Sequence, residues 1–182
     1  MKKTMMAAFV SVALIGGISN VVAAADGTVN FKGNIIDSAC VVDLDGAGAT
    51  TMDVMMGDVH TTAFSGVGST AGGTASATKF NIVLKDCPAS VATAKLKFDG
   101  IAYSGDNTVL ALTDEAGKAT GVGIQLSDKA GVLPLYTESS AYTLTTGTGT
   151  ENQLDFYARY IQKETAVTAG KANSIATFTV NY

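Results

Sequence analysis

Apolar and polar side chains alternate one by one along several stretches of this sequence, and this period limits the chain to a sheet fold. The pattern is clearest in residues 152–161, where Leu154, Phe156 and Ala158 alternate with polar side chains. The same period recurs in four other stretches, residues 78–87, 94–98, 121–127 and 176–182. A period of two places one face of a strand in the core and the other in water. We therefore predict an all-β sandwich or barrel.

The segments between these predicted strands are rich in glycine, threonine, serine and alanine. Residues 43–51, 65–77 and 145–150 are interpreted as loops. Asp99-Gly100 is expected to turn the chain directly after the strand at 94–98. There is no repeat and no sign of a second domain, and the length suits one hydrophobic core.

The first 24 residues read as a secretory signal peptide. Lys2 and Lys3 precede an apolar stretch, residues 5–18, and small residues follow it up to Ala25. That stretch is shorter than the roughly 20 residues that a membrane span needs. Cleavage after Ala23, Ala24 or Ala25 fits the pattern, and we take Ala24. The remaining chain is expected to be exported and not membrane-embedded.

Cys40 and Cys87 are the only cysteines, and both follow the predicted signal peptide. In an oxidising compartment such a pair is expected to form a disulfide. A redox or metal-binding pair is the alternative, but the C-x-x-C spacing and neighbouring ligands are missing. In the chain-entropy model the cross-link would stabilise the fold by about 4 kcal/mol.

Charge and composition argue against nucleic-acid binding and catalysis. The formal net charge is −4, Arg159 is the only arginine, and the lysines are scattered. His60 is the only histidine and lies in a polar neighbourhood, and no G-x-S-x-G motif is present. We therefore predict no enzyme activity.

The remaining polar motifs are better explained by structure than by ligand binding. Asp43-Leu44-Asp45-Gly46 lacks the other ligands of a calcium loop and is read as a turn. Tyr157, Arg159 and Tyr160 could suggest a sugar site, but alternate aromatic residues in a strand usually pack. We predict no cofactor and no metal.

Both ends of the exported chain alternate in the same way as its interior. At the start, one side of an extended strand would carry Gly27, Val29, Phe31, Gly33 and Ile35. At the end, one side would carry Ala176, Phe178, Val180 and Tyr182. Periodicity alone does not distinguish the outer strands of a closed sandwich from strands that pair between molecules.

The stretch from Gly27 to Cys40 resembles the G-x-V-x-F-x-G-x-[IV]-x-x-A-x-C opening of chaperone–usher pilus subunits, type 1 major fimbrial subunits in particular. Residues 80–87 resemble the second cysteine strand of that family, and residues 156–160 its F-x-A-R-Y strand. Gly170 and the alternating end resemble its C-terminal signature. The resemblance covers essentially the whole chain after residue 24.

The resemblance implies an incomplete immunoglobulin-like β-sandwich that lacks its last strand. A periplasmic pilus chaperone would lend a strand to the open groove, and at the outer-membrane usher the N-terminal extension of the next subunit would replace it. Residues 25–36 would be this extension and residues 37–182 the pilin domain. The donor side chains would be Gly27, Val29, Phe31, Gly33 and Ile35. The groove would be bordered by Gly170, Ala176, Phe178, Val180 and Tyr182.

The function implied is that of a structural subunit of a bacterial fimbria that supports cell adhesion. It would polymerise with copies of itself or with related pilins, and would travel through the periplasm to the cell surface. A minor or adaptor fimbrial subunit is one alternative. An unrelated, self-contained secreted β-sandwich binding module is another.

Overall fold

Strands form nearly all of the regular structure in this computed structural model, which describes residues 29–33, 39–44, 48–71 and 77–182. The chain divides into two compact units, Met1–Ile35 and Ile36–Tyr182. The elements of the second unit are β1 (Val41–Asp43), η1 (Thr61–Ala63), β2 (Thr78–Lys85), β3 (Thr93–Gly100), β4 (Ala102–Tyr103), β5 (Asp106–Leu110), β6 (Val122–Asp128), β7 (Gly131–Val132), β8 (Tyr142–Thr143), β9 (Glu151–Gln162) and β10 (Ala176–Asn181).

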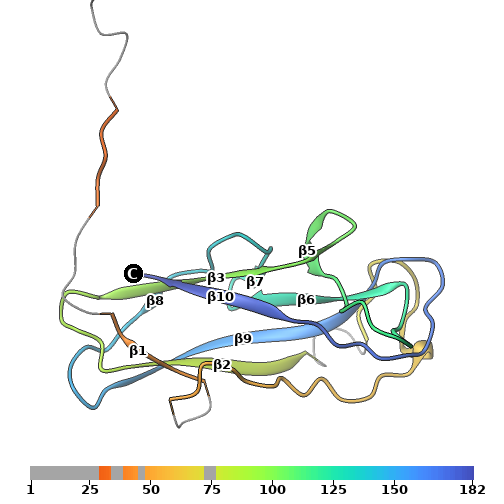
Figure 1. Cartoon of the computed structure of the whole chain (residues 1–182), viewed down its shortest axis with the longest axis horizontal. Coiled ribbons are helices and arrows are strands. Elements are labelled where there is room, and N and C mark those ends of the chain that lie inside the picture. Colours follow the sequence, from red (N-terminus) through yellow and green to blue (C-terminus); the bar gives the residue numbers. More distant parts are fainter. Residues whose placement is uncertain (1–28, 34–38, 45–47, 72–76) are drawn as a thin grey trace, which may run out of the picture. The chain divides into compact units, whose positions relative to one another are not determined.

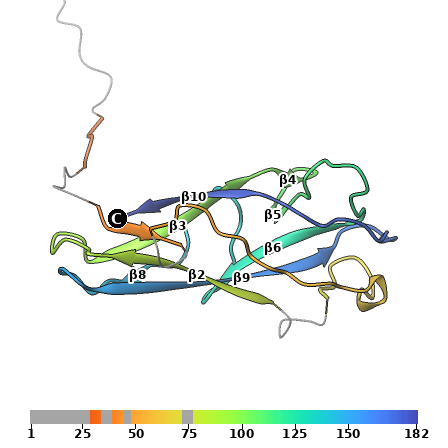
Figure 2. The same cartoon turned by 60° about the horizontal axis from the view of Figure 1, so that its bottom comes forward.

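The strands form two antiparallel sheets. The larger sheet has the order β1-β2-β9-β6-β5-β4, with β7 added to β6, and the smaller has the order β10-β3-β8. Figures 1 and 2 show β3 and β10 lying over β2, β6 and β9 as two layers. Sequence-distant strands are neighbours in both sheets, since β2 pairs with β9 and β3 pairs with β10. The all-β prediction is confirmed.

The core between the sheets is built by the alternating residues that the sequence singled out. Phe156 of β9 is fully buried, and its ring lies 5.1 Å from that of Phe98 in β3 and 5.8 Å from that of Phe80 in β2. Leu84 and Leu96 are fully buried beside them. Because aromatic rings bury large apolar areas, this cluster fixes the spacing of the two layers.

Strand β6 departs from the expected pattern of one buried and one wet face. Val122, Ile124 and Leu126 are buried as predicted, but Gly123 and Gln125 between them are buried as well. A Cβ atom on Gly123 would lie 2.8 Å from the carbonyl oxygen of Leu110, so β5 leaves no room for a side chain there. The side-chain oxygen Oε1 of Gln125 accepts hydrogen bonds from the guanidinium of Arg159 at 2.7 and 3.1 Å.

The predicted turn at Asp99-Gly100 is wrong, because both residues belong to β3 and pair with β10. An added Cβ at Gly100 would lie 2.4 Å from Cδ1 of Leu110, so a side chain at this position would displace the Leu110 side chain. The turn comes later, at Ser104 and Gly105, whose φ angles are 47° and 85°. Two residues with positive φ are typical of a tight hairpin, here joining β4 to β5.

Candidate functional site

The last strand, β10, has one open edge. It pairs along its whole length with β3, and no other strand among the described residues pairs with it. An unpaired edge presents a row of backbone N–H and C=O groups that can bind another strand. An antiparallel edge strand turns the main-chain groups of alternate residues outward, so the groups that would bind a partner belong to every second residue of 176–181.

The side chains of β10 give this edge an apolar side. Phe178 and Val180 pack against the core but remain half-buried, and the Phe178 ring lies 6.2 Å from that of Phe98. Thr177 and Thr179, on the opposite face, are exposed. An incoming strand could therefore cover Phe178 and Val180 while it pairs with the backbone.

Tyr182, one residue beyond β10, lies at the cysteine pair. The backbone N–H of Cys40 donates a hydrogen bond to the Tyr182 phenol oxygen, while burial raises the pKa of that phenol. Cys40 is joined to Cys87 by the predicted disulfide, which is confirmed. The cross-link attaches β1, a three-residue edge strand, firmly to the end of β2.

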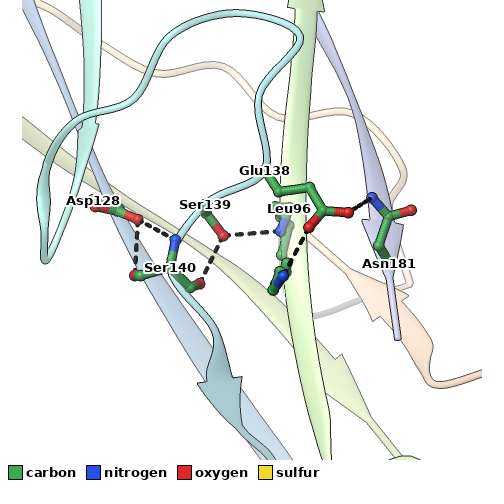
Figure 3. Close-up of polar contacts among 7 residues, drawn as sticks. Leu96, Asp128, Glu138, Ser139, Ser140 and Asn181 are labelled. Atoms are coloured by element: carbon green, nitrogen blue, oxygen red, sulfur yellow. Dashed lines mark hydrogen bonds and ion pairs between the residues drawn. The ribbon is translucent and has the colours of Figure 1, made fainter.

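The Glu138 carboxylate also contacts the C-terminal end of β10 (Figure 3). Glu138 accepts a hydrogen bond from the side-chain amide of Asn181 at 3.1 Å and pairs with the Lys95 ammonium at 2.9 Å. The Lys95 hydrogen bond is the main reason that the pKa of Glu138 is lowered. Glu138 thus ties the last residue of β10 to β3.

The loop that carries Glu138 is itself fixed to both sheets (Figure 3). The Ser139 hydroxyl accepts a hydrogen bond from the Leu96 N–H at 2.9 Å. The Asp128 carboxylate, at the end of β6, accepts two from the N–H and hydroxyl of Ser140 at 2.7 and 2.8 Å. Burial is the largest single influence and raises the pKa of Asp128, but these bonds, together with those from the N–H groups of Ala130 and Gly131, outweigh it, so the net effect is a lowered pKa.

Gly170 lies outside β10, in the segment that leads to it, and so does not belong to the strand with which the sequence grouped it. A Cβ atom there would lie 2.5 Å from the carbonyl oxygen of Gly117 and 2.6 Å from the N atom of Ala119. The backbone of its neighbour Lys171 forms an isolated parallel β-bridge with the backbone of Lys118. Gly170 therefore permits two backbones to approach closely just before β10.

A cavity of about 350 Å³ lies beside this segment. Its wall combines residues 167–173 with Val122 at the start of β6, Tyr160 near the end of β9, and Phe64 after η1. The Tyr160 hydroxyl donates to the carbonyl of Ala172 at 3.1 Å. The cavity is thus partly apolar and has a fixed wall.

Residues 29–33, the described part of the N-terminal unit, form no strand within this chain. A strand is defined by a ladder to a neighbour, and alternation in the sequence does not supply one. Val29 and Phe31 are 75% and 93% exposed. Gly27 and Ile35, the outer members of the predicted donor set, lie outside the described residues.

One feature beside the site was missed in the sequence. Residues 51–56 follow β1 without a strand assignment, yet Met52, Val54 and Met56 are half-buried while their neighbours are exposed. Polar and apolar residues alternate in Thr51-Met52-Asp53-Val54, and this alternation could have indicated an extended segment with one buried side. Glycine-rich flanks obscured it. This segment supplies Met56 to the edge of the core.

The described residues hold no helix long and apolar enough to cross a bilayer, and no group of three or more potential metal ligands. His60 is exposed just before η1. The disulfide-linked antiparallel sandwich is an immunoglobulin-like β-domain whose last strand, β10, has an unpaired edge with half-buried apolar side chains beside it.

Comparison with known proteins identifies the family. A sequence model described as "Fimbrial protein" matches residues 29–182, and the chain belongs to this family. The type-1 fimbrial protein A chain of Escherichia coli K12 is 43% identical over 162 residues, covering 86% of this chain and 83% of that protein. The type 1 fimbrial subunit of Klebsiella pneumoniae is equally similar, with the same identity and coverage.

Solved structures agree with the fold. A type I fimbria protein of Burkholderia pseudomallei has a TM-score of 0.57 and 40% identity, covering 86% of this chain and 97% of that one. The P pilus rod subunit has a TM-score of 0.61 at 21% identity, covering 80% and 99%. The predicted resemblance is confirmed: the chain is an immunoglobulin-like structural pilus subunit of the surface fimbrium, from a family of structural proteins and not enzymes.

Proposed function

We propose that this subunit polymerises by donor-strand exchange, in which residues 25–36 of one copy pair with the open edge of β10 in the next. The observation that carries this proposal is the unpartnered edge of β10 among the described residues, with Phe178 and Val180 only half-buried beside it. Strand addition of this kind derives affinity from main-chain hydrogen bonds and register from alternate side chains.

The donor segment suits that edge in length and pattern. Residues 29–35 span seven positions against the six of β10, and strands rise by about 3.3 Å per residue. Val29, Phe31 and Ile35 would enter the groove, and Gly33 would lie where a side chain has no room. The cavity near Tyr160, at the start of β10, could receive a side chain from one end of the segment.

Buried side chains and backbone hydrogen bonds both contribute to the free energy of the link. Three buried apolar side chains contribute about 1.5–3 kcal/mol each. Each new backbone hydrogen bond adds about 0.5–1.5 kcal/mol. Association and ordering subtract from this total, at about 4–15 kcal/mol for lost translation and rotation.

The route to the fibre follows from the same open edge. Residues 1–24 act as the signal peptide, and residues 37–182 form the pilin domain. Because an exposed edge would aggregate, a periplasmic chaperone supplies a temporary strand. An outer-membrane usher then joins the subunits and delivers them to the surface.

Peptide capture tests the proposal. The chain from Asp37 onward is melted with and without a synthetic peptide of residues 25–36. We expect strong and slow stabilisation by the peptide. Gly33→Leu or Phe31→Asp in the peptide abolishes it, whereas Lys32→Ala, on the other face, preserves it. A truncated chain that melts cooperatively and ignores the peptide would show that no acceptor groove exists.

A further inference from the structure

The methionines that follow residue 24 all lie in one short segment. They are Met52, Met55 and Met56. The only two cysteines of the chain are joined to each other in the disulfide. Two-electron oxidants attack thioethers and free thiols most readily, so after residue 24 the oxidisable sulfur atoms are concentrated within five positions.

The three thioethers differ in how far the fold covers them. Met55 is 81% exposed, whereas Met52 and Met56 are half-buried. Of the three, only Met56 packs against the hydrophobic core. An oxidant must reach the sulfur atom, so Met55 is expected to react first and the two half-buried methionines more slowly.

Side-chain packing, not a strand ladder, holds this segment in place. The main-chain groups of residues 51–59 form no hydrogen bond with main-chain groups of the described residues. Gly57, Asp58 and Val59 come directly after Met56 and line the cavity of about 350 Å³. Weaker packing at Met56 would therefore free both the segment and one wall of that cavity.

We infer that Met52, Met55 and Met56 form an oxidation site, at which sulfoxide formation on Met56 releases residues 51–59 from the core. With hydrogen peroxide as the oxidant, the thioether sulfur gives an electron pair to one peroxide oxygen. An S–O bond forms and the O–O bond breaks. The departing oxygen takes the proton of the transferred hydroxyl and leaves as water, so sulfur is oxidised by two electrons and peroxide is reduced by two.

The same product has a different consequence at each position. Oxidation replaces an apolar thioether with a polar sulfoxide. At Met55 the new S–O group points into water and leaves the packing unchanged. At Met56 it lies against apolar side chains, where a polar group without a hydrogen-bond partner is unfavourable. Moving residues 51–59 away from the core relieves this cost. Neither the donor segment nor the edge of β10 takes part, so the inference is independent of donor-strand exchange.

The order of reaction is measured by mass spectrometry. The chain from Ala25 to Tyr182 is treated with hydrogen peroxide, and the sulfoxide at each methionine is followed over time by peptide mapping. In the folded chain Met55 should be oxidised several-fold faster than Met56, and in concentrated urea the rates should be equal. Equal rates in the folded chain would overturn the inference, because Met56 would then not be covered by the core.

The consequence is measured by urea melts of the chains before and after complete oxidation. Met56→Leu keeps a side chain of similar volume but forms no sulfoxide, and Met52→Leu and Met55→Leu are the matched controls. Oxidation should raise the unfolding constant of the wild type and of both controls about tenfold, the effect of burying an unpaired polar group, and leave that of Met56→Leu unchanged. An equal rise in Met56→Leu, or no rise in any chain, would overturn the inference.

Discussion

Gly170 shows how an exposed residue can be fixed by packing alone. Its backbone approaches residues 117–119 so closely that a methyl group would meet main-chain atoms, which cannot rotate away. The clash, not positive φ, is what demands glycine at this position.

We therefore expect Gly170→Ala to destabilise the domain by about 1–3 kcal/mol, the usual cost of overpacking. The denaturant midpoint measures this cost. Gly33→Ala is the control, because nothing lies within 4 Å of a Cβ at that position. Equal midpoints for the two variants would contradict the close approach at Gly170.

Asp106 carries the clearest pH dependence. Its pKa is lowered to about 2, mainly by the hydrogen bond from Lys163, at 2.7 Å, and then by Thr108. The folded pKa lies below the unfolded one, so the carboxylate stabilises the fold above about pH 4. This contribution is lost as the pH falls from 4 towards 2.

Asp106→Asn should therefore lower the free energy of unfolding at pH 7 by about 1 kcal/mol, since solvent screens the half-exposed pair. The difference between wild type and variant should shrink as the pH falls towards 2. Urea melts from pH 7 to pH 2 measure it. A constant difference across this range would rule out titration of Asp106 as the cause.

At the scale of elements, the sequence predicts strands well where one face is dry and the other wet. Phe80 and Phe156 follow this rule in β2 and β9, and the cysteine pair follows from compartment and count. The rule failed at β6, where Gln125 is buried by pairing with Arg159, a long-range contact that no local period contains. The turn predicted at Gly100 was also wrong. Glycine is favoured both in turns and where a neighbouring residue comes close to the backbone, and the sequence does not distinguish the two.

The strength of β10 at its open end depends on a contact outside the strand. Glu138 joins Lys95 and Asn181, so removing its carboxylate should loosen the last residues of β10 without unfolding the core. Hydrogen exchange at the amides of Thr179 and Asn181 should be about 5–10-fold faster in Glu138→Ala, because this end of the strand would open more often.

Glu138→Gln separates the two contacts of this side chain. The amide carbonyl can still accept a hydrogen bond from Asn181, but the ion pair with Lys95 is lost. We expect exchange in this variant to lie closer to wild type than to Glu138→Ala. Unchanged exchange in both variants would mean that pairing with β3 alone holds β10.

At the scale of the whole molecule, the subunit has two different reactive surfaces. Its N-terminal segment carries exposed apolar side chains, and its last strand has an open edge. Two unlike surfaces on one chain form a head-to-tail contact, and such contacts generate open filaments instead of closed dimers. Growth by one subunit therefore leaves one donor and one acceptor unused at the ends.

This polarity makes a prediction about mixtures. Phe31→Asp removes the donor and keeps the acceptor edge, whereas Val180→Asp places a carboxylate beside the edge and keeps the donor. Each variant alone should stay monomeric, because every link needs both surfaces. Mixed together, the Val180→Asp copy donates its strand to the Phe31→Asp copy, and the product has neither surface left.

The mixture should therefore yield dimers and nothing longer, as measured by size-exclusion chromatography with light scattering. Thermal melts of each variant first establish that both are folded, since Val180 packs against the core. Long fibres in the mixture would mean that subunits join by some other surface. Persistent monomers would mean that β10 is not the acceptor, because the intact donor and the intact edge are both present and fail to combine.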